Sequence, residues 1–207
     1  MKFDITLISG IKKKNIEIAS SNLVMENKIK IVAISGSLRN NSSATNIIKH
    51  VIKLFPESIN FILYEGIGML SHFDDNENVA DEVKAFREML TQADGIFICQ
   101  PEYAFGVAGS LKNALDWIVS SGELDNKPLA LVTAATGGDK AHAAMLLTLK
   151  ALNAKIGEGA KLLIPFVRTK LNDKGEVINT EIIESLESVL NALIETINGK
   201  RAELNPA

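Results

Sequence analysis

The sequence lacks the features that mark secreted, membrane-spanning and nucleic-acid-binding proteins. It has a single cysteine, Cys99, so no intrachain disulfide can form, and this fits a protein of the reducing cytoplasm. No apolar run reaches the roughly 18 residues of a membrane span, and Asp4 interrupts the apolar stretch that a signal peptide would need. The formal net charge is only −3, which leaves no broad basic field for nucleic acid or an anionic membrane. We therefore expect neither nucleic acid nor a membrane as a partner.

Metal-ligand patterns are also missing. His50, His72 and His142 are scattered, with no cysteine or carboxylate at ligand spacing, so we predict no metal site. His142 opens a predicted helix beside the loop that follows the fourth strand; a place near a ligand bound there is the alternative, but we expect a surface role. Cys99 ends a predicted buried strand, where cysteine usually acts as a small hydrophobic residue.

The sequence does have an alternation of strand and helix patterns from residue 28 onward. Short apolar runs predict five strands, at 29–34, 59–64, 95–99, 128–133 and 161–164. Apolar residues at helical spacing follow each strand; the stripe of the second helix includes Val79, and that of the third runs to Ile118. This alternation predicts an α/β fold, a doubly wound five-stranded parallel sheet with helices on both faces.

The two ends of the chain depart from this alternation. Residues 1–27 are expected to form a mobile N-terminal extension outside the core, and Met25 within them could be the true start. We expect the folded domain to span 28–198 and a C-terminal tail to follow at 199–207.

The loop after the first strand has the composition of an anion site. In doubly wound sheets ligands bind outside the carboxyl ends of the strands. Gly36 permits a tight turn there, and a helix that begins near Ser43 points its free N–H groups and positive dipole end toward the loop. The phosphate donors of this loop are the side chains of Ser37, Arg39, Ser42 and Ser43.

An ordinary strand-to-helix turn with a serine N-cap is the alternative for this loop. The loop is neither a Walker loop, which needs Gly-Lys-Ser/Thr, nor a Gly-x-Gly-x-x-Gly fingerprint. Its place after the first buried strand favours anion binding, while nucleoside triphosphate hydrolysis and a Rossmann-type NAD site are disfavoured.

The loop after the third strand contains the most specific stretch of the chain. Pro101 fixes the backbone as it leaves the strand, and Tyr103 and Phe105 offer apolar surface to a flat ring, although plain loop packing is the alternative for both. The stretch 101–117, from Pro-Glu-Tyr to Leu-Lys-Asn-Ala-Leu-Asp-Trp, resembles the corresponding motif of the NAD(P)H-dependent FMN reductases, which include quinone, azo-dye and chromate reductases. We expect Trp117 in the core or at a subunit interface.

The resemblance covers roughly residues 28–198 and implies a flavodoxin-like fold that binds FMN. The first loop is similar to the family's phosphate loop, and 133–138 is similar to its third flavin loop. The cofactor-binding residues expected from all three loops are Ser37, Arg39, Ser42, Ser43, Pro101, Glu102, Tyr103, Ala104, Phe105, Ala135, Thr136, Gly137 and Gly138. The family usually has asparagine at the positions of Ala44 and Ala104 and often proline at that of Ala108, but backbone N–H groups survive these changes, so FMN binding is still expected.

The activity that the resemblance implies is a two-step flavin reaction. A hydride passes from NADPH or NADH to bound FMN, and electrons pass on to a small acceptor such as free flavin, a quinone, an azo compound or a metal oxyanion. No side chain is evident as a catalytic acid or base. The resemblance also implies a homodimer or homotetramer. A flavodoxin-like electron carrier without direct use of NAD(P)H and a non-enzymatic binding protein on the same fold are the alternatives.

Overall fold

The computed structural model describes residues 28–55, 59–74, 76 and 78–204. The extension expected at 1–27 lies outside these residues. Five strands form one sheet: β1 (Ile29–Ser35), β2 (Ile59–Tyr64), β3 (Gly95–Gln100), β4 (Leu129–Ala134) and β5 (Lys161–Ile164). Each strand lies within one residue of its predicted bounds.

All neighbouring strands are parallel, in the order β2-β1-β3-β4-β5. This is the doubly wound order of flavodoxin-like folds, with the topological switch beside β1, and it confirms the predicted fold class. Every residue of β3 and β4 is buried, as expected when helices cover both faces of a parallel sheet.

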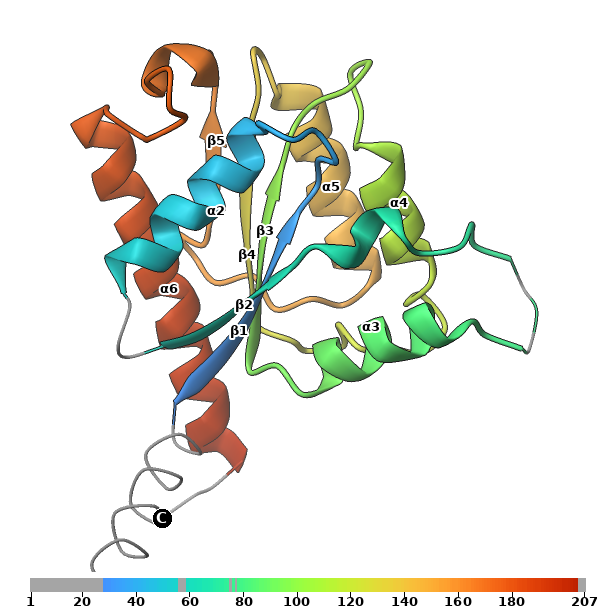
Figure 1. Ribbon diagram of the computed structural model, residues 1–207. Helices are drawn as coiled ribbons and strands as arrows, with labels where there is room; N and C mark the ends of the chain where they lie inside the picture. The colour runs from blue at the N-terminus through green and yellow to red at the C-terminus, as the bar shows by residue number, and fades with distance from the viewer. Residues whose placement is uncertain (1–27, 56–58, 75, 77, 205–207) are drawn as a thin grey trace, which may run out of the picture.

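The helices divide between the two faces of the sheet (Figure 1). α2 (Ser43–Leu54) and α6 (Thr180–Leu204) bury Ile47, Ile48, Leu186 and Leu190 against one face. α3 (Asp81–Thr91), α4 (Gly109–Asp116) and α5 (Asp139–Ala151) cover the other. No helix among the described residues is both long and apolar enough to cross a membrane.

The helix bounds correct three details of the sequence prediction. Val79 precedes α3, whose N-cap is Ala80, and Ile118 lies beyond the end of α4. α6 continues to Leu204, past the boundary expected at 198. Its last turns are held to the rest of the domain because Arg201 Nη2 lies 2.8 Å from Asp94 Oδ2, in an ion pair at the start of β3.

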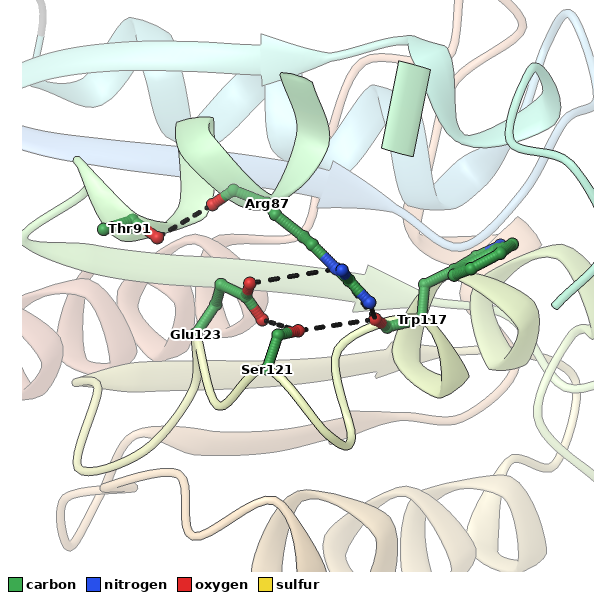
Figure 2. A network of polar contacts seen from close by, with 5 residues as sticks. All are labelled: Arg87, Thr91, Trp117, Ser121 and Glu123. Atoms are coloured by element: carbon green, nitrogen blue, oxygen red, sulfur yellow. Dashed lines mark hydrogen bonds and ion pairs between the residues drawn. The ribbon is translucent and has the colours of Figure 1, made fainter. Parts of the chain in front are cut away.

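A polar network explains where α4 ends and where Trp117 lies (Figure 2). Arg87, from α3, donates through Nε to the Trp117 carbonyl at 3.0 Å and lies 3.9 Å from the Glu123 carboxylate. Ser121 donates to that carboxylate at 2.6 Å. The Trp117 indole is buried and donates to the Ser71 carbonyl at 2.7 Å. Trp117 is thus a core residue, one of the two positions expected for it.

Two short 3₁₀ turns were not predicted, η1 (Gly66–Gly68) and η2 (Val167–Lys170). η2 follows β5, so it lies at the carboxyl edge of the sheet together with the loops after β1, β3 and β4 (Figure 1). The candidate functional site lies at this edge.

Candidate functional site

A cavity of about 240 Å³ opens at the carboxyl edge of the sheet, between the loops that follow β1, β3, β4 and β5. Its lining residues are Ser37, Arg39, Asn41, Ser42, Ser43, Ala44, Pro101, Glu102, Tyr103, Ala134, Ala135, Thr136, Val167 and Arg168. The three loops singled out in the sequence therefore converge on one cavity, and a fourth loop joins them.

The start of α2 presents an unused set of hydrogen-bond donors to this cavity. Ser42 is the N-cap with extended backbone angles, yet its hydroxyl makes no capping hydrogen bond and is left for another acceptor. The first N–H groups of an α-helix have no partner within the helix, and the first turn of α2 contains no acidic residue that would compete for them. Together with the helix dipole, this arrangement favours an anion.

The loop after β1 is held in place by its serines and by Gly36. The Gly36 N–H donates to the Cys99 carbonyl at 2.8 Å, and a Cβ at position 36 would lie 2.9 Å from Leu111 Cδ2 and 3.0 Å from Gln100 Cβ. Glycine is thus required for this close approach. The Ser37 Oγ accepts the Arg39 N–H at 3.3 Å and lies 3.1 Å from Tyr103 Oη, which ties the phosphate loop to the loop after β3.

Two arginine side chains line the cavity, Arg39 and Arg168. Both are exposed, and neither forms a side-chain hydrogen bond or ion pair with another described residue. The sequence prediction does not include Arg168, because no motif marks the loop after the fifth strand, although η2 follows β5 and must reach the same edge in a parallel sheet. Val167, Asn41, Ala44 and Ala134 are the other lining residues that the site prediction omitted.

The loop after β3 forms a tight turn whose two tip residues are not part of the cavity lining. The Tyr103 and Gly106 backbones exchange hydrogen bonds at 3.1 and 2.9 Å. The two central residues, Ala104 and Phe105, have φ angles of +49° and +60°, as in a type I′ turn. Neither lines the cavity, and Phe105 is 80% exposed.

Glu102 joins the second loop to the third. Its carboxylate lines the cavity but accepts the N–H groups of Gly138 at 3.2 Å and Ala141 at 3.0 Å. This negative group caps the start of α5, where the helix dipole stabilises it. Gly137 and Gly138 do not line the cavity. Gly138 has a φ of +100°, which favours glycine, and turns the chain into α5.

His142 takes part in a small group of polar contacts next to the third loop. The His142 Nδ1 lies 2.8 Å from Thr133 Oγ1, and Gln100 Nε2 donates to the same hydroxyl at 3.2 Å. The His142 ring is thus half-buried against the end of β4 and is less exposed than the surface role expected for it would require. Burial, followed by the nearby charge of Lys161, lowers the pKa of His142 below its ordinary value of 6.5.

Two further sequence predictions concern the role of Cys99, which does not line the cavity, and the absence of a metal site. Cys99 is fully buried in β3, and burial raises the pKa of its thiol, so it is the small hydrophobic residue expected from the sequence. Within the described ranges, no three His, Cys, Asp or Glu side chains gather where they could hold a metal ion.

The residues present fit a flavin mononucleotide. The unengaged Ser42 hydroxyl, the free N–H groups of α2 and Arg39 suit a phosphate, and Ser42, Ser43 and Arg39 line the same cavity. Tyr103 and the small residues Ala135 and Thr136 also line this cavity, and they offer apolar surface to a flat ring.

The chain is similar to known flavin-dependent reductases in sequence and in structure. The model of a family described as NADPH-dependent FMN reductase matches residues 29–168. A quinone reductase of Escherichia coli strain K12 is 28% identical over 183 residues, which cover 84% of this chain and 97% of that protein. An NAD(P)H-dependent FMN reductase of Pseudomonas aeruginosa is 28% identical over 176 residues, or 82% and 95% of the two chains. Among solved structures, the flavoenzyme NAD(P)H:(acceptor) oxidoreductase FerB of Paracoccus denitrificans superposes with a TM-score of 0.74 at 22% identity, over 83% of this chain and 98% of that one.

Proposed function

Because the chain belongs to the NADPH-dependent FMN reductase family, we propose that it binds FMN in the cavity at the carboxyl edge of the sheet and acts as an NAD(P)H-dependent oxidoreductase. The observation that carries the proposal is the convergence of the loops after β1, β3 and β4 on one cavity, with anion donors at the start of α2 and apolar surface at Tyr103.

The cofactor and the protein have separate roles in the proposed reaction. When bound, FMN would supply the redox chemistry, namely hydride uptake from NADPH or NADH and electron transfer to an acceptor. Arg39, Ser37 and Ser42 hold the phosphate, and the backbone of 102–103 and 135–136 borders the ring. Glu102 fixes the third loop by holding the start of α5. Each of its two oxygens accepts one backbone hydrogen bond, which gives Glu102 a positioning role in the site.

Protons come from solvent in this proposal. Glu102 is engaged by α5, and the Tyr103 hydroxyl is engaged by Ser37. No histidine, lysine or cysteine is among the described residues that line the cavity. A cavity open to water can supply the protons that reduction of the acceptor requires.

The acceptor is a small molecule, and we propose a quinone or free flavin. Relatives are named as a quinone reductase and as an FMN reductase, and a Bacillus protein that is 30% identical over 110 residues, 53% of this chain, is named as an NADPH azoreductase. Azo compounds and metal oxyanions are therefore kept as further acceptors. We also propose a cytoplasmic homodimer or homotetramer, in which exposed Phe105 and Phe166 near the cavity would be covered by a second copy.

Anaerobic reduction tests the proposal. Purified protein is reconstituted with FMN, and its flavin absorption is followed after addition of NADPH or NADH. We expect bleaching with one or both donors and recovery of the absorption when a quinone or free flavin is added. Bound flavin that stays oxidised would favour an electron carrier instead, and protein that does not bind FMN at all would favour a non-enzymatic binding protein.

A further inference from the structure

We propose that Arg168 forms, together with Arg39, a two-arginine clamp on the flavin 5′-phosphate, and that this clamp selects phosphorylated flavin over riboflavin. The inference rests on the proposed function, because it requires flavin in the cavity.

The two arginines reach one place from strands that are not neighbours. Arg39 follows β1 and Arg168 follows β5, and β3 and β4 lie between these strands in the sheet. Both side chains line the main cavity, and both also line a polar outer cavity of about 300 Å³. Asn41 and Ser43, beside the start of α2, line both cavities as well. Arg168 therefore lies at the anion end of the site.

The backbone that carries Arg168 is fixed to the third loop. The Phe166 N–H donates to the Thr136 carbonyl at 3.0 Å, and the Val167 N–H donates to the Ala135 carbonyl at 3.1 Å. Phe166 has a left-handed φ of +50°, which turns the chain out of β5, and the Val167 side chain is buried. The start of η2 is thus held by the loop that borders the proposed ring site, while the Arg168 side chain stays free.

The charge balance of the site calls for a doubly charged ligand. Two guanidinium groups that line one cavity repel each other unless an anion lies between them. Glu102 is the one acidic residue in the described lining of the main cavity, its carboxylate is engaged by α5, and the lining of the outer cavity contains none. A phosphate monoester carries a charge of about −1.5 to −2 at pH 7 and accepts bidentate bonds from arginine. Riboflavin has no such group.

Flavin titration of the full-length apoprotein tests the clamp. The variants are Arg168→Ala, Arg168→Lys and the control Lys170→Ala, which removes a positive charge from the same 3₁₀ turn at a residue that lines neither cavity. Dissociation constants for FMN and for riboflavin are measured by quenching of flavin fluorescence, at low and at high salt.

We expect Arg168→Ala to weaken FMN binding roughly 10- to 100-fold, the usual loss for a charged hydrogen bond, with riboflavin unaffected. The salt dependence of FMN affinity should become shallower. Arg168→Lys should restore part of the affinity, and Lys170→Ala should leave it unchanged.

Three results would overturn the clamp. Equal losses for FMN and riboflavin would mean that Arg168 only shapes the turn. Unchanged FMN affinity with a raised KM for NADPH would assign Arg168 to the hydride donor. Unchanged values for all ligands would leave it without a binding role. Wild-type protein that binds no FMN would instead refute the proposed function itself.

Discussion

Two residues of the second loop are held in a backbone conformation that their side chains disfavour. Ala104 and Phe105 have φ angles of +49° and +60° at the centre of the Tyr103–Gly106 turn, where Asn or Gly is the usual choice. A left-handed residue with a Cβ costs roughly 1–2 kcal/mol, and asparagine tolerates the conformation better than alanine does. The family that the chain resembles usually has asparagine at the position of Ala104, and the left-handed backbone gives a physical reason for that choice.

Replacing Ala104 should therefore stabilise the protein. We expect Ala104→Gly and Ala104→Asn to raise the free energy of unfolding by roughly 0.5–1 kcal/mol, measured by urea denaturation. The matched control is Ala143→Gly, an exposed position within α5, where the same exchange should lower stability by roughly 0.5–1 kcal/mol. Loss of stability at both positions would show that the turn is not strained.

His142 should contribute to the pH dependence of stability. Burial and Lys161 lower its pKa in the folded state below the 6.5 of the unfolded chain, so the unfolded state binds more protons between these two values. Stability is then lost as pH falls through 6.5 toward the folded pKa, and the loss is complete below that pKa.

His142→Asn tests this contribution, because it keeps a polar group beside Thr133 but does not titrate there. We expect the variant to lose less stability than the wild type between pH 7 and pH 5, in urea titrations at each pH. A smaller slope should remain, since burial, then Lys53, also lowers the pKa of His50. Identical slopes in the two proteins would contradict the assignment.

At the scale of elements, the contact between α3 and the end of α4 depends on Arg87 (Figure 2). The Glu123 side chain is 7% exposed, and the Trp117 carbonyl at the end of α4 accepts from the guanidinium. Arg87→Met removes both interactions and leaves a buried carboxylate with Ser121 as its remaining side-chain partner. We expect a loss of roughly 2–4 kcal/mol in the free energy of unfolding.

The matched control lies one turn earlier on the same helix. Lys84 pairs with Asp81 on the surface at 2.9 Å, and Lys84→Met should change stability by less than about 1 kcal/mol because exposed ion pairs contribute little. Equal effects of the two methionine variants would show that the Arg87 network adds nothing beyond surface charge.

The strands were predictable to within a residue, and the helix ends were not. The strand at 59–64 is a short, mainly apolar run between Ser58 and Glu65, and the strand at 161–164 is another such run that ends before Pro165, so the local pattern defines both. The end of α4 depends on Arg87, which lies far away in the sequence. η2 is too short for any periodicity, and hydrogen bonds to the third loop place it. Arg168 was missed for the same reason, since its role follows from strand order rather than from a local motif.

At the scale of the whole molecule, FMN should stabilise all parts of the domain together. The cavity is built by loops after β1, β3, β4 and β5, so it exists only when the whole sheet is formed. A ligand at about 100 times its Kd adds roughly 2.7 kcal/mol to the free energy of unfolding. We expect this gain in the wild type with FMN, measured by urea denaturation monitored through circular dichroism.

Arg39→Ala should lose most of that gain at the same FMN concentration, because it removes a phosphate donor and leaves the core intact. The matched control is Lys53→Ala. It also removes a positive charge, but from the last turn of α2, where Lys53 is exposed and does not line the cavity. It should keep the full gain. If FMN stabilised Arg39→Ala as strongly as the control, the phosphate would have to bind elsewhere, and the anion site at the start of α2 would be misassigned.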